Sequence, residues 1–243
     1  MKTLLSLLLV AMLGAGAFHA QTRGLTTFTT ETARRADIAR APRALPDAAL
    51  ILPSGGQAGL LRDLREDGRI AIVNFIYTRC MSLCLAMGSE MQQLQDALRR
   101  NGGAEHVRVL SLSFDPADTP PYLARYGEVM HADPDIWRFA TLGNKRERDA
   151  LLKAAGIIVV PAPYGQYEHN AAYHVVSPDG RLLRIFDLND IDPVLDYVMR
   201  RAERGNGAAI ALPDAEDGGR GVPGQRGALP TQSPATAGER KPR

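Results

Sequence analysis

Residues 69–77 (RIAIVNFIY) are almost continuously apolar and rich in isoleucine and valine. A run of this length and composition is typical of a strand that is buried on both faces of a sheet. The period then changes, because apolar residues recur at intervals of three and four from Leu83 to Leu98, as they do on one face of a helix. A buried strand that leads into an amphipathic helix predicts an α/β domain.

The rest of the chain continues this alternation of strands and helices. We expect further strands over residues 48–52, 106–114, 137–142, 173–177 and 181–187, and further helices over 122–130, 145–155 and 192–202. The last two strands flank a tight-turn signal, Pro-Asp-Gly. Together these segments predict an α/β fold with a central mixed sheet flanked by helices.

The N-terminus has the pattern of a secretory signal peptide. Lys2 precedes an apolar core over residues 4–13, and small residues follow at 14–17. This pattern predicts a signal peptide over residues 1–20 and export to the periplasm or another extracytoplasmic compartment. The apolar core is shorter than the roughly 20 residues of a spanning helix, so we expect no membrane span in the mature chain. An uncleaved membrane anchor is the alternative.

Composition divides the remaining chain into three parts. Residues 21–45 are polar and are interpreted as a linker, and a globular domain is expected over 46–204. Residues 205–243 consist largely of glycine, proline, alanine and charged residues, which predicts a disordered tail because such a segment buries too little surface to offset its ordering entropy. The formal net charge is only +2, which argues against nucleic acid as a partner.

Cys80 and Cys84 are the only two cysteines, and they lie where the buried strand gives way to the helix. On a helix, this spacing places both thiols on one face with their Cβ atoms about 5–6 Å apart. Such a pair closes a disulfide bond or chelates a soft metal ion, and the spacing alone does not decide between the two. A purely structural disulfide is disfavoured because so small a loop gains little from closure.

A third ligand would favour the metal. His169 follows residues 161–168, which we interpret as an irregular exposed loop, and in a thioredoxin-like sheet this loop lies at the same end as the cysteines. Two thiolates and an imidazole form a three-coordinate site that suits Cu(I) and can hold Cu(II). His174 alternates into its strand and is expected to be a packing or a surface residue rather than a ligand.

Other potential site residues have simpler interpretations. Met87 and Met91 are expected to fill the core, although Met81 could offer a thioether to Cu(I). Asp115 and Asp118 are either turn and capping residues or paired catalytic carboxylates. We prefer turn and capping roles, which explain them more simply. Glu168 is either a partner that orients His169 or an ordinary exposed glutamate.

Three segments, in this order, make the chain similar to the Sco/SenC proteins, which are thioredoxin-fold copper proteins of cytochrome c oxidase assembly. The segments are residues 74–84 (NFIYTRCMSLC), residues 112–120 (LSFDPADTP), and His169 followed by the stretch from Tyr173 to Phe186. The similarity spans roughly residues 46–200, and the combination is more specific than any one segment.

The resemblance implies a thioredoxin-like Sco domain that binds copper through Cys80, Cys84 and His169. It also implies a copper chaperone that delivers copper to, or reduces thiols at, the binuclear site of cytochrome c oxidase subunit II or of another cuproprotein. We expect a monomer that meets this partner by diffusion. The family usually has proline after the second cysteine and often after the first, whereas this chain has Leu85 and Met81.

Two alternatives stay open. In the first, Cys80 and Cys84 are the redox-active pair of a thiol-disulfide oxidoreductase: one thiolate attacks a partner's disulfide and the other resolves the mixed disulfide. That chemistry does not require His169. In the second, the protein senses or stores copper in the periplasm and has no oxidase partner.

Overall fold

The computed structural model describes residues 2–21, 29–80 and 83–210, without the side chains of 2, 21, 83–86 and 205–210. An eight-stranded mixed sheet lies at the centre, in the order β1-β10-β9-β4-β5-β6-β2-β3, and β7 and β8 form a separate hairpin. The strands are β1 (Arg43–Ala44), β2 (Ala49–Ile51), β3 (Gln57–Gly59), β4 (Ile70–Ile76), β5 (Val107–Ser113), β6 (Trp137–Leu142), β7 (Val159–Ala162), β8 (Gln166–His169), β9 (Tyr173–Val176) and β10 (Arg181–Phe186).

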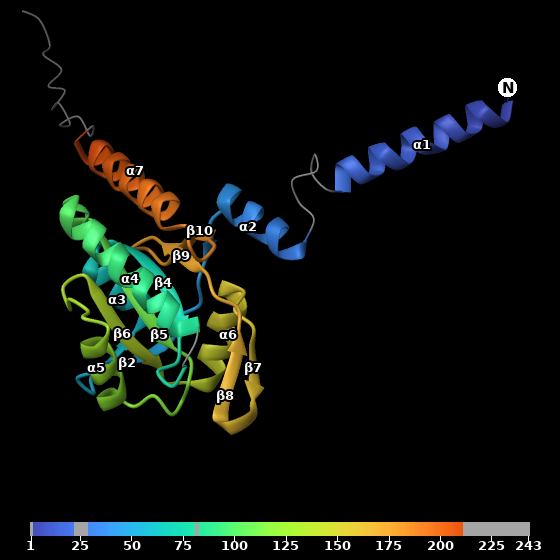
Figure 1. Ribbon diagram of the computed structural model, residues 1–243. Coiled ribbons are helices and arrows are strands. Elements are labelled where there is room, and N and C mark those ends of the chain that lie inside the picture. The colour runs from blue at the N-terminus through green and yellow to red at the C-terminus, as the bar shows by residue number, and fades with distance from the viewer. Residues whose placement is uncertain (1, 22–28, 81–82, 211–243) are drawn as a thin grey trace, which may run out of the picture.

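Helices surround this sheet (Figure 1). They are α2 (Thr30–Arg40), α3 (Leu60–Asp67), α4 (Leu83–Arg100), α5 (Pro120–Val129), α6 (Lys145–Ala155) and α7 (Ile191–Ile210), with 3-10 turns η1 (Gly103–Glu105) and η2 (Pro163–Gly165). A further helix, α1 (Lys2–Gln21), lies apart from the sheet. The predicted mixed sheet flanked by helices is therefore confirmed.

The centre of the sheet explains the long apolar run in the sequence. All seven residues of β4 are buried, and β4 pairs in parallel with β5 from Ile70↔Val107 to Ile76↔Ser113. Side chains on both faces of such a central strand are covered by other elements, so a continuous apolar sequence is required. Because the two strands are parallel, β4 and β5 both end at the same end of the sheet.

Helices cover both faces of the sheet. On one face, Leu64 of α3 and Leu151 of α6 line the same small apolar space as Val73 and Phe75 of β4. Figure 1 shows α4 lying across the other face, with α7 next to it. The turn between β9 and β10 depends on Gly180, whose φ of +79° is readily adopted only by glycine.

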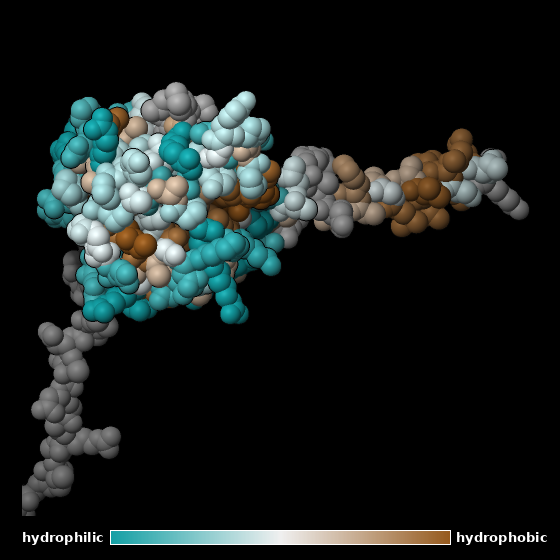
Figure 2. All heavy atoms as spheres, turned by 90° about the horizontal axis from the view of Figure 1, so that it is seen from below, coloured by the Kyte–Doolittle hydropathy of each residue, from teal (hydrophilic) through white to brown (hydrophobic). Residues whose placement is uncertain are grey.

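The helix α1 extends away from the globular part and is brown over most of its length in Figure 2. Its window from Thr3 to Ala20 has a mean hydropathy of 1.9 and is not buried anywhere in the structure. By length and composition this helix could cross a membrane, and an N-terminal signal sequence meets the same criteria. The predicted signal peptide over residues 1–20 stays a prediction.

The structure corrects three expectations of irregular chain. Residues 21–45 include the helix α2, which docks by its buried residue Ile38, and residues 161–168 belong to the β7–β8 hairpin rather than to an irregular loop. The closing helix α7 continues to Ile210, so residues 205–210 are helical instead of being part of a disordered tail. The rest of that tail, residues 211–243, lies outside the described residues.

Candidate metal centre

The two cysteines lie around the start of α4. The segment after β4 turns at once, and the backbone N–H of Cys80 donates to the carbonyl oxygen of Tyr77 at 3.3 Å. Cys80 is 7% exposed and precedes the helix, whereas Cys84 lies in its first turn. Helix geometry therefore does not by itself set the separation of the two thiols, because a turn comes before the helix. Met81 and the side chain of Cys84 lie outside the described residues.

A buried carboxylate on a different segment holds residues 77–80, which we call the cysteine loop. Asp118, which is 2% exposed, follows β5 and precedes α5. Its carboxylate accepts hydrogen bonds from the backbone N–H of Thr78 at 2.7 Å, from the Thr78 hydroxyl at 2.6 Å and from the Ser113 hydroxyl at 2.6 Å. Hydrogen bonds to a charged acceptor are strong, so Asp118 fixes the backbone two residues before Cys80.

A second carboxylate supports the same loop. Asp115 accepts from the backbone N–H of Ala117 at 2.9 Å, as a turn residue does, and pairs with the guanidinium of Arg79 at 2.6 Å. The hydrogen bond from Arg79 to Asp115 raises the pKa of Arg79. Turn and capping roles therefore do not describe these two residues fully. Asp115 and Asp118 also hold Arg79 and Thr78, the two residues before Cys80.

His169 reaches this loop from the β7–β8 hairpin. Its imidazole packs edge-on against the rings of Phe114 and Tyr77, with ring centroids 5.0 Å and 5.9 Å away. The hydroxyl of Tyr77 donates to the backbone carbonyl oxygen of Tyr167 at 3.0 Å and accepts from the N–H of Tyr167 at 3.3 Å. Since Tyr77 and Phe114 directly follow β4 and β5, these contacts bring His169 to the same end of the sheet as the cysteine loop.

The hydrogen bonding of His169 favours metal binding through its outer nitrogen. Its Nδ1 lies 3.0 Å from the carbonyl oxygen of Asn170. A carbonyl oxygen only accepts, so Nδ1 carries the proton and Nε2 presents its lone pair. Burial lowers the pKa of His169 below its ordinary value of 6.5, which favours the neutral imidazole that a metal requires. The hydrogen bond that orients the imidazole of His169 through Nδ1 is made to Asn170 and not to Glu168.

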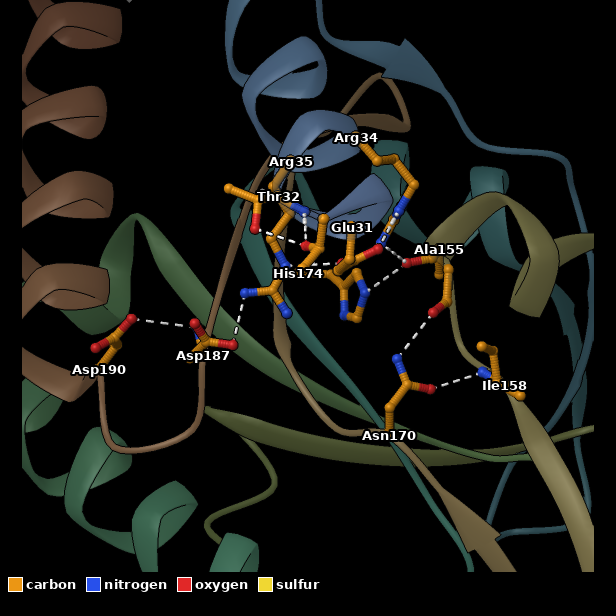
Figure 3. A network of polar contacts seen from close by, with 12 residues as sticks. Glu31, Thr32, Arg34, Arg35, Ala155, Ile158, Asn170, His174, Asp187 and Asp190 are labelled. Carbon is orange, nitrogen blue, oxygen red and sulfur yellow. Dashed lines mark hydrogen bonds and ion pairs between the residues drawn. The ribbon is translucent and has the colours of Figure 1, made fainter. Parts of the chain in front are cut away.

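The remaining candidates lie elsewhere. His174 is buried, and its Nε2 lies 2.9 Å from the carbonyl oxygen of Ala155 in the network of Figure 3. Of the two roles expected for it, packing or surface, the structure shows packing. Met87 and Met91 are buried in the core, as expected. No group of three or more His, Cys, Asp or Glu side chains with the arrangement of a metal site occurs among the described residues, which exclude the side chain of Cys84. The ligand set Cys80, Cys84 and His169 stays a prediction.

Comparison with known proteins identifies the family. Residues 57–200, more than half of the chain, match the family model described as SCO1/SenC. The chain belongs to the SCO1/SenC family. A curated relative from Bacillus subtilis (strain 168), named SCO1 protein homolog, is 31% identical over 136 residues, which cover 54% of this chain and 68% of the relative.

Solved Sco structures share the fold. ScoI from Arabidopsis thaliana, crystallised with copper bound, is 20% identical with a TM-score of 0.57, and the match covers 66% of this chain and 99% of that one. A structure of BsSco is 26% identical with a TM-score of 0.57 and covers 67% and 95% of the two chains. That protein is described as a Sco cytochrome c oxidase assembly protein in which a disulfide switch was identified. The thioredoxin-like fold of these Sco neighbours is thus the fold of this chain.

Proposed function

We propose that this protein is an exported metallochaperone that binds one copper ion and passes it to the binuclear copper site of cytochrome c oxidase. The observation that carries the proposal is the position of His169. Its imidazole packs against Tyr77 and Phe114, at the end of the sheet where the chain leaves β4 for Cys80. One imidazole and two thiolates form a donor set suited to Cu(I), and copper-bound Sco neighbours support this choice of metal.

In this proposal each residue has a separate part. The thiolates of Cys80 and Cys84 and the imidazole of His169 hold the copper that is the cargo. Asp118 and Asp115 keep the cysteine loop in place. Tyr77 joins that loop to the hairpin that carries His169. The copper leaves when ligands of an acceptor protein replace these three side chains. We propose that this acceptor is the copper-binding domain of oxidase subunit II.

Copper titration of the reduced protein tests this proposal. The wild type is expected to bind one copper and, as Cu(II), to show sulfur-to-copper charge-transfer absorption. His169→Ala and the double variant Cys80→Ser/Cys84→Ser are expected to lose stoichiometric binding, whereas His106→Ala serves as a matched control. Full copper occupancy in the double variant would contradict the proposal.

A thiol-disulfide oxidoreductase is the second candidate, and the disulfide switch described for BsSco favours it. One thiolate attacks a partner's disulfide and forms a mixed disulfide; the other thiolate then displaces the partner's second sulfur. The partner gains two electrons and leaves as a dithiol, while Cys80 and Cys84 become a disulfide. Oxidase assembly that survives His169→Ala would favour this reaction, because a three-ligand copper site needs the histidine.

A further inference from the structure

The large exposed apolar side chains of the globular part lie on two segments that come close to the cysteine loop. Outside α1, the described part of the chain has five: Tyr122, Val129, Ile158, Val160 and Tyr164. Two belong to α5, and three lie on or directly before the β7–β8 hairpin. Figure 2 shows brown, hydrophobic patches on one face of the globular part. Clustering of this kind marks an interaction site, whereas single exposed apolar residues have no such meaning.

Both segments border the cysteine loop. A groove of about 300 Å³ lies between that loop and α5, and it is lined by Cys80 and Arg79 on one side and by Tyr122, Arg125 and Val129 on the other. On the other side of the loop, the hairpin comes close to the same arginine, because a Cβ atom on Gly165 would lie 3.3 Å from Nη1 of Arg79. Figure 1 shows α5 and the hairpin on opposite sides of this end of the sheet.

The residue at the tip of the hairpin, Tyr164, exposes its ring to solvent and has an unfavourable backbone conformation. Tyr164 is 98% exposed and has a φ of +60°, in the left-handed region that side chains other than glycine seldom adopt. Strained positions of this kind are concentrated at functional sites, where other contacts hold them in place. Here the hairpin is held by Tyr77 and its bonds to Tyr167.

The groove has a positive rim. Among the described residues that line it, Arg79 and Arg125 are cationic and none carries a carboxylate. Asp115 neutralises part of the charge on Arg79 from beneath, whereas Arg125 is exposed on α5. The surface around Cys80 therefore combines apolar side chains with positive charge.

We propose that α5, the cysteine loop and the β7–β8 hairpin form the docking surface for the copper acceptor, a protein domain that places an apolar side chain bordered by carboxylates against the groove. The proposal rests on the proposed copper delivery and adds the chemistry of the partner. Carboxylates around the acceptor's own site would pair with Arg79 and Arg125, steer the encounter and fix its orientation. An apolar side chain would fill the groove and exclude water beside Cys80.

Two other occupants fit the surface less well. A second copy of this chain would bring the same arginines face to face, because a two-fold interface repeats its own surface. An anionic membrane is usually recognised by clusters of roughly four to eight basic residues, and here only Arg79 and Arg125 line the groove. Membrane docking would also cover the cysteine loop, from which copper has to leave.

The test uses the copper-loaded protein and the copper-free soluble domain of the host's oxidase subunit II, with the second-order rate constant of copper transfer followed by stopped-flow absorption. Arg125→Glu is expected to lower this constant about tenfold at low salt, and the deficit should shrink as salt screens the charges. Arg200→Glu is the matched control, because Arg200 is exposed on α7 and the neighbouring Met199 lies against Gly103, beyond the C-terminal end of α4.

A second pair of variants tests the apolar part. Tyr122→Ser/Val129→Ser is expected to raise the half-saturating concentration of the acceptor several-fold and to leave unchanged the transfer rate at saturation, the copper affinity and the melting temperature. Ala124→Ser, at an exposed position of the same helix, is the control and should behave as the wild type.

The outcomes separate the two proposals. If the wild type transfers copper and all variants match it, the docking surface is wrong and the delivery function stands. If the wild type transfers none, the delivery function fails, and docking is then decided by calorimetric titration of the same acceptor domain into wild type and variants. A dimer in sedimentation velocity that Arg125→Glu alters, or co-sedimentation with phosphatidylserine vesicles that the variants abolish, would assign the surface to another occupant and overturn the proposal.

Discussion

The carboxylate of Asp118 accepts the backbone N–H of Thr78 at 2.7 Å and the hydroxyl of the same residue at 2.6 Å. Thr78 lies two residues before Cys80, whereas Asp118 belongs to the segment between β5 and α5. The conformation of the cysteine loop is therefore fixed by a buried charge from a neighbouring strand connection. This arrangement gives the loop a defined shape before any copper binds, which reduces the ordering that binding would otherwise require.

Asp118→Asn keeps the shape of the side chain and removes its charge. We expect the free energy of unfolding to fall by about 1.5–3 kcal/mol, the contribution typical of hydrogen bonds to a charged group, and the copper affinity to fall with it. Urea unfolding and competition with a chromophoric Cu(I) chelator would measure the two effects. Asp149→Asn is the control, since the exposed pair of Asp149 with Lys145 should contribute less than about 1 kcal/mol. Unchanged copper affinity would leave Asp118 with a structural role only.

Tyr77→Phe removes the hydroxyl that joins the cysteine loop to the hairpin. The backbone groups of Tyr167 lose this partner, so we expect a loss of about 1 kcal/mol and a copper affinity several-fold lower because His169 is held less firmly. Copper competition on the folded variant checks this. Tyr197→Phe, on α7, is the matched control. A variant that binds copper as tightly as the wild type would show that the ring contacts of His169 are sufficient.

Ile38→Ala tests whether α2 is part of the folded domain. Ile38 is 1% exposed, and truncation of a buried isoleucine costs about 2–5 kcal/mol. We therefore expect a clear drop in the unfolding midpoint in urea, whereas Ala39→Ser, at an exposed position of the same helix, should change it little. Equal midpoints for the two variants would mean that α2 does not dock in solution.

His174 should make the fold sensitive to acid. Burial lowers its pKa to about 4, below the ordinary value of 6.5, so between these two pH values the unfolded chain takes up a proton that the folded protein does not. Stability from this group is complete above pH 6.5 and is lost as the pH falls towards 4, by up to about 3 kcal/mol. Glu31 belongs to the same polar network as His174 (Figure 3). The hydrogen bond from Arg34 lowers the pKa of Glu31 to about 2, so in the folded protein Glu31 titrates below the pH range in which His174 acts.

The measurement is the free energy of unfolding in urea between pH 7 and pH 4. His174→Gln cannot titrate and should show a flatter profile than the wild type across that range, even if it is less stable at pH 7. His131→Gln is the control, because His131 is exposed and should leave the profile unchanged. Parallel profiles for wild type and His174→Gln would contradict the assignment.

The central elements could be predicted because the pattern of apolar residues within each one indicates which of its faces are buried. The apolar run that became β4 and the three-to-four spacing that became α4 each reflect one constant environment along the element. The helix α2 gave no such signal, since most of its residues are polar. It is held by Ile38 and by contacts such as the one from Arg34 to the carbonyl of Ala155 at 3.0 Å, across 121 positions in sequence.

The candidate site was predictable only in part, for a related reason. His169 could be selected because a family resemblance singled it out, and its approach to the cysteine loop agrees with that choice. The hairpin that carries it contains Pro161 and Pro163, which usually interrupt strands, so its regular pairing was missed. The role of Asp118 depends on burial against Thr78 and Ser113, and no feature of its local sequence separates it from an ordinary capping aspartate.

The docked position of α2 limits how far the domain can move from a membrane. Ile38 is buried, and Arg35 pairs with Asp187 at 2.6 Å beyond β10, so α2 moves with the body. If α1 stays in a membrane, only residues 22–29 separate it from α2, and eight extended residues span at most about 30 Å. A linker over all of 21–45 would reach about 90 Å. If the proposed copper delivery holds, an anchored form of this protein therefore has to meet its acceptor close to the membrane surface.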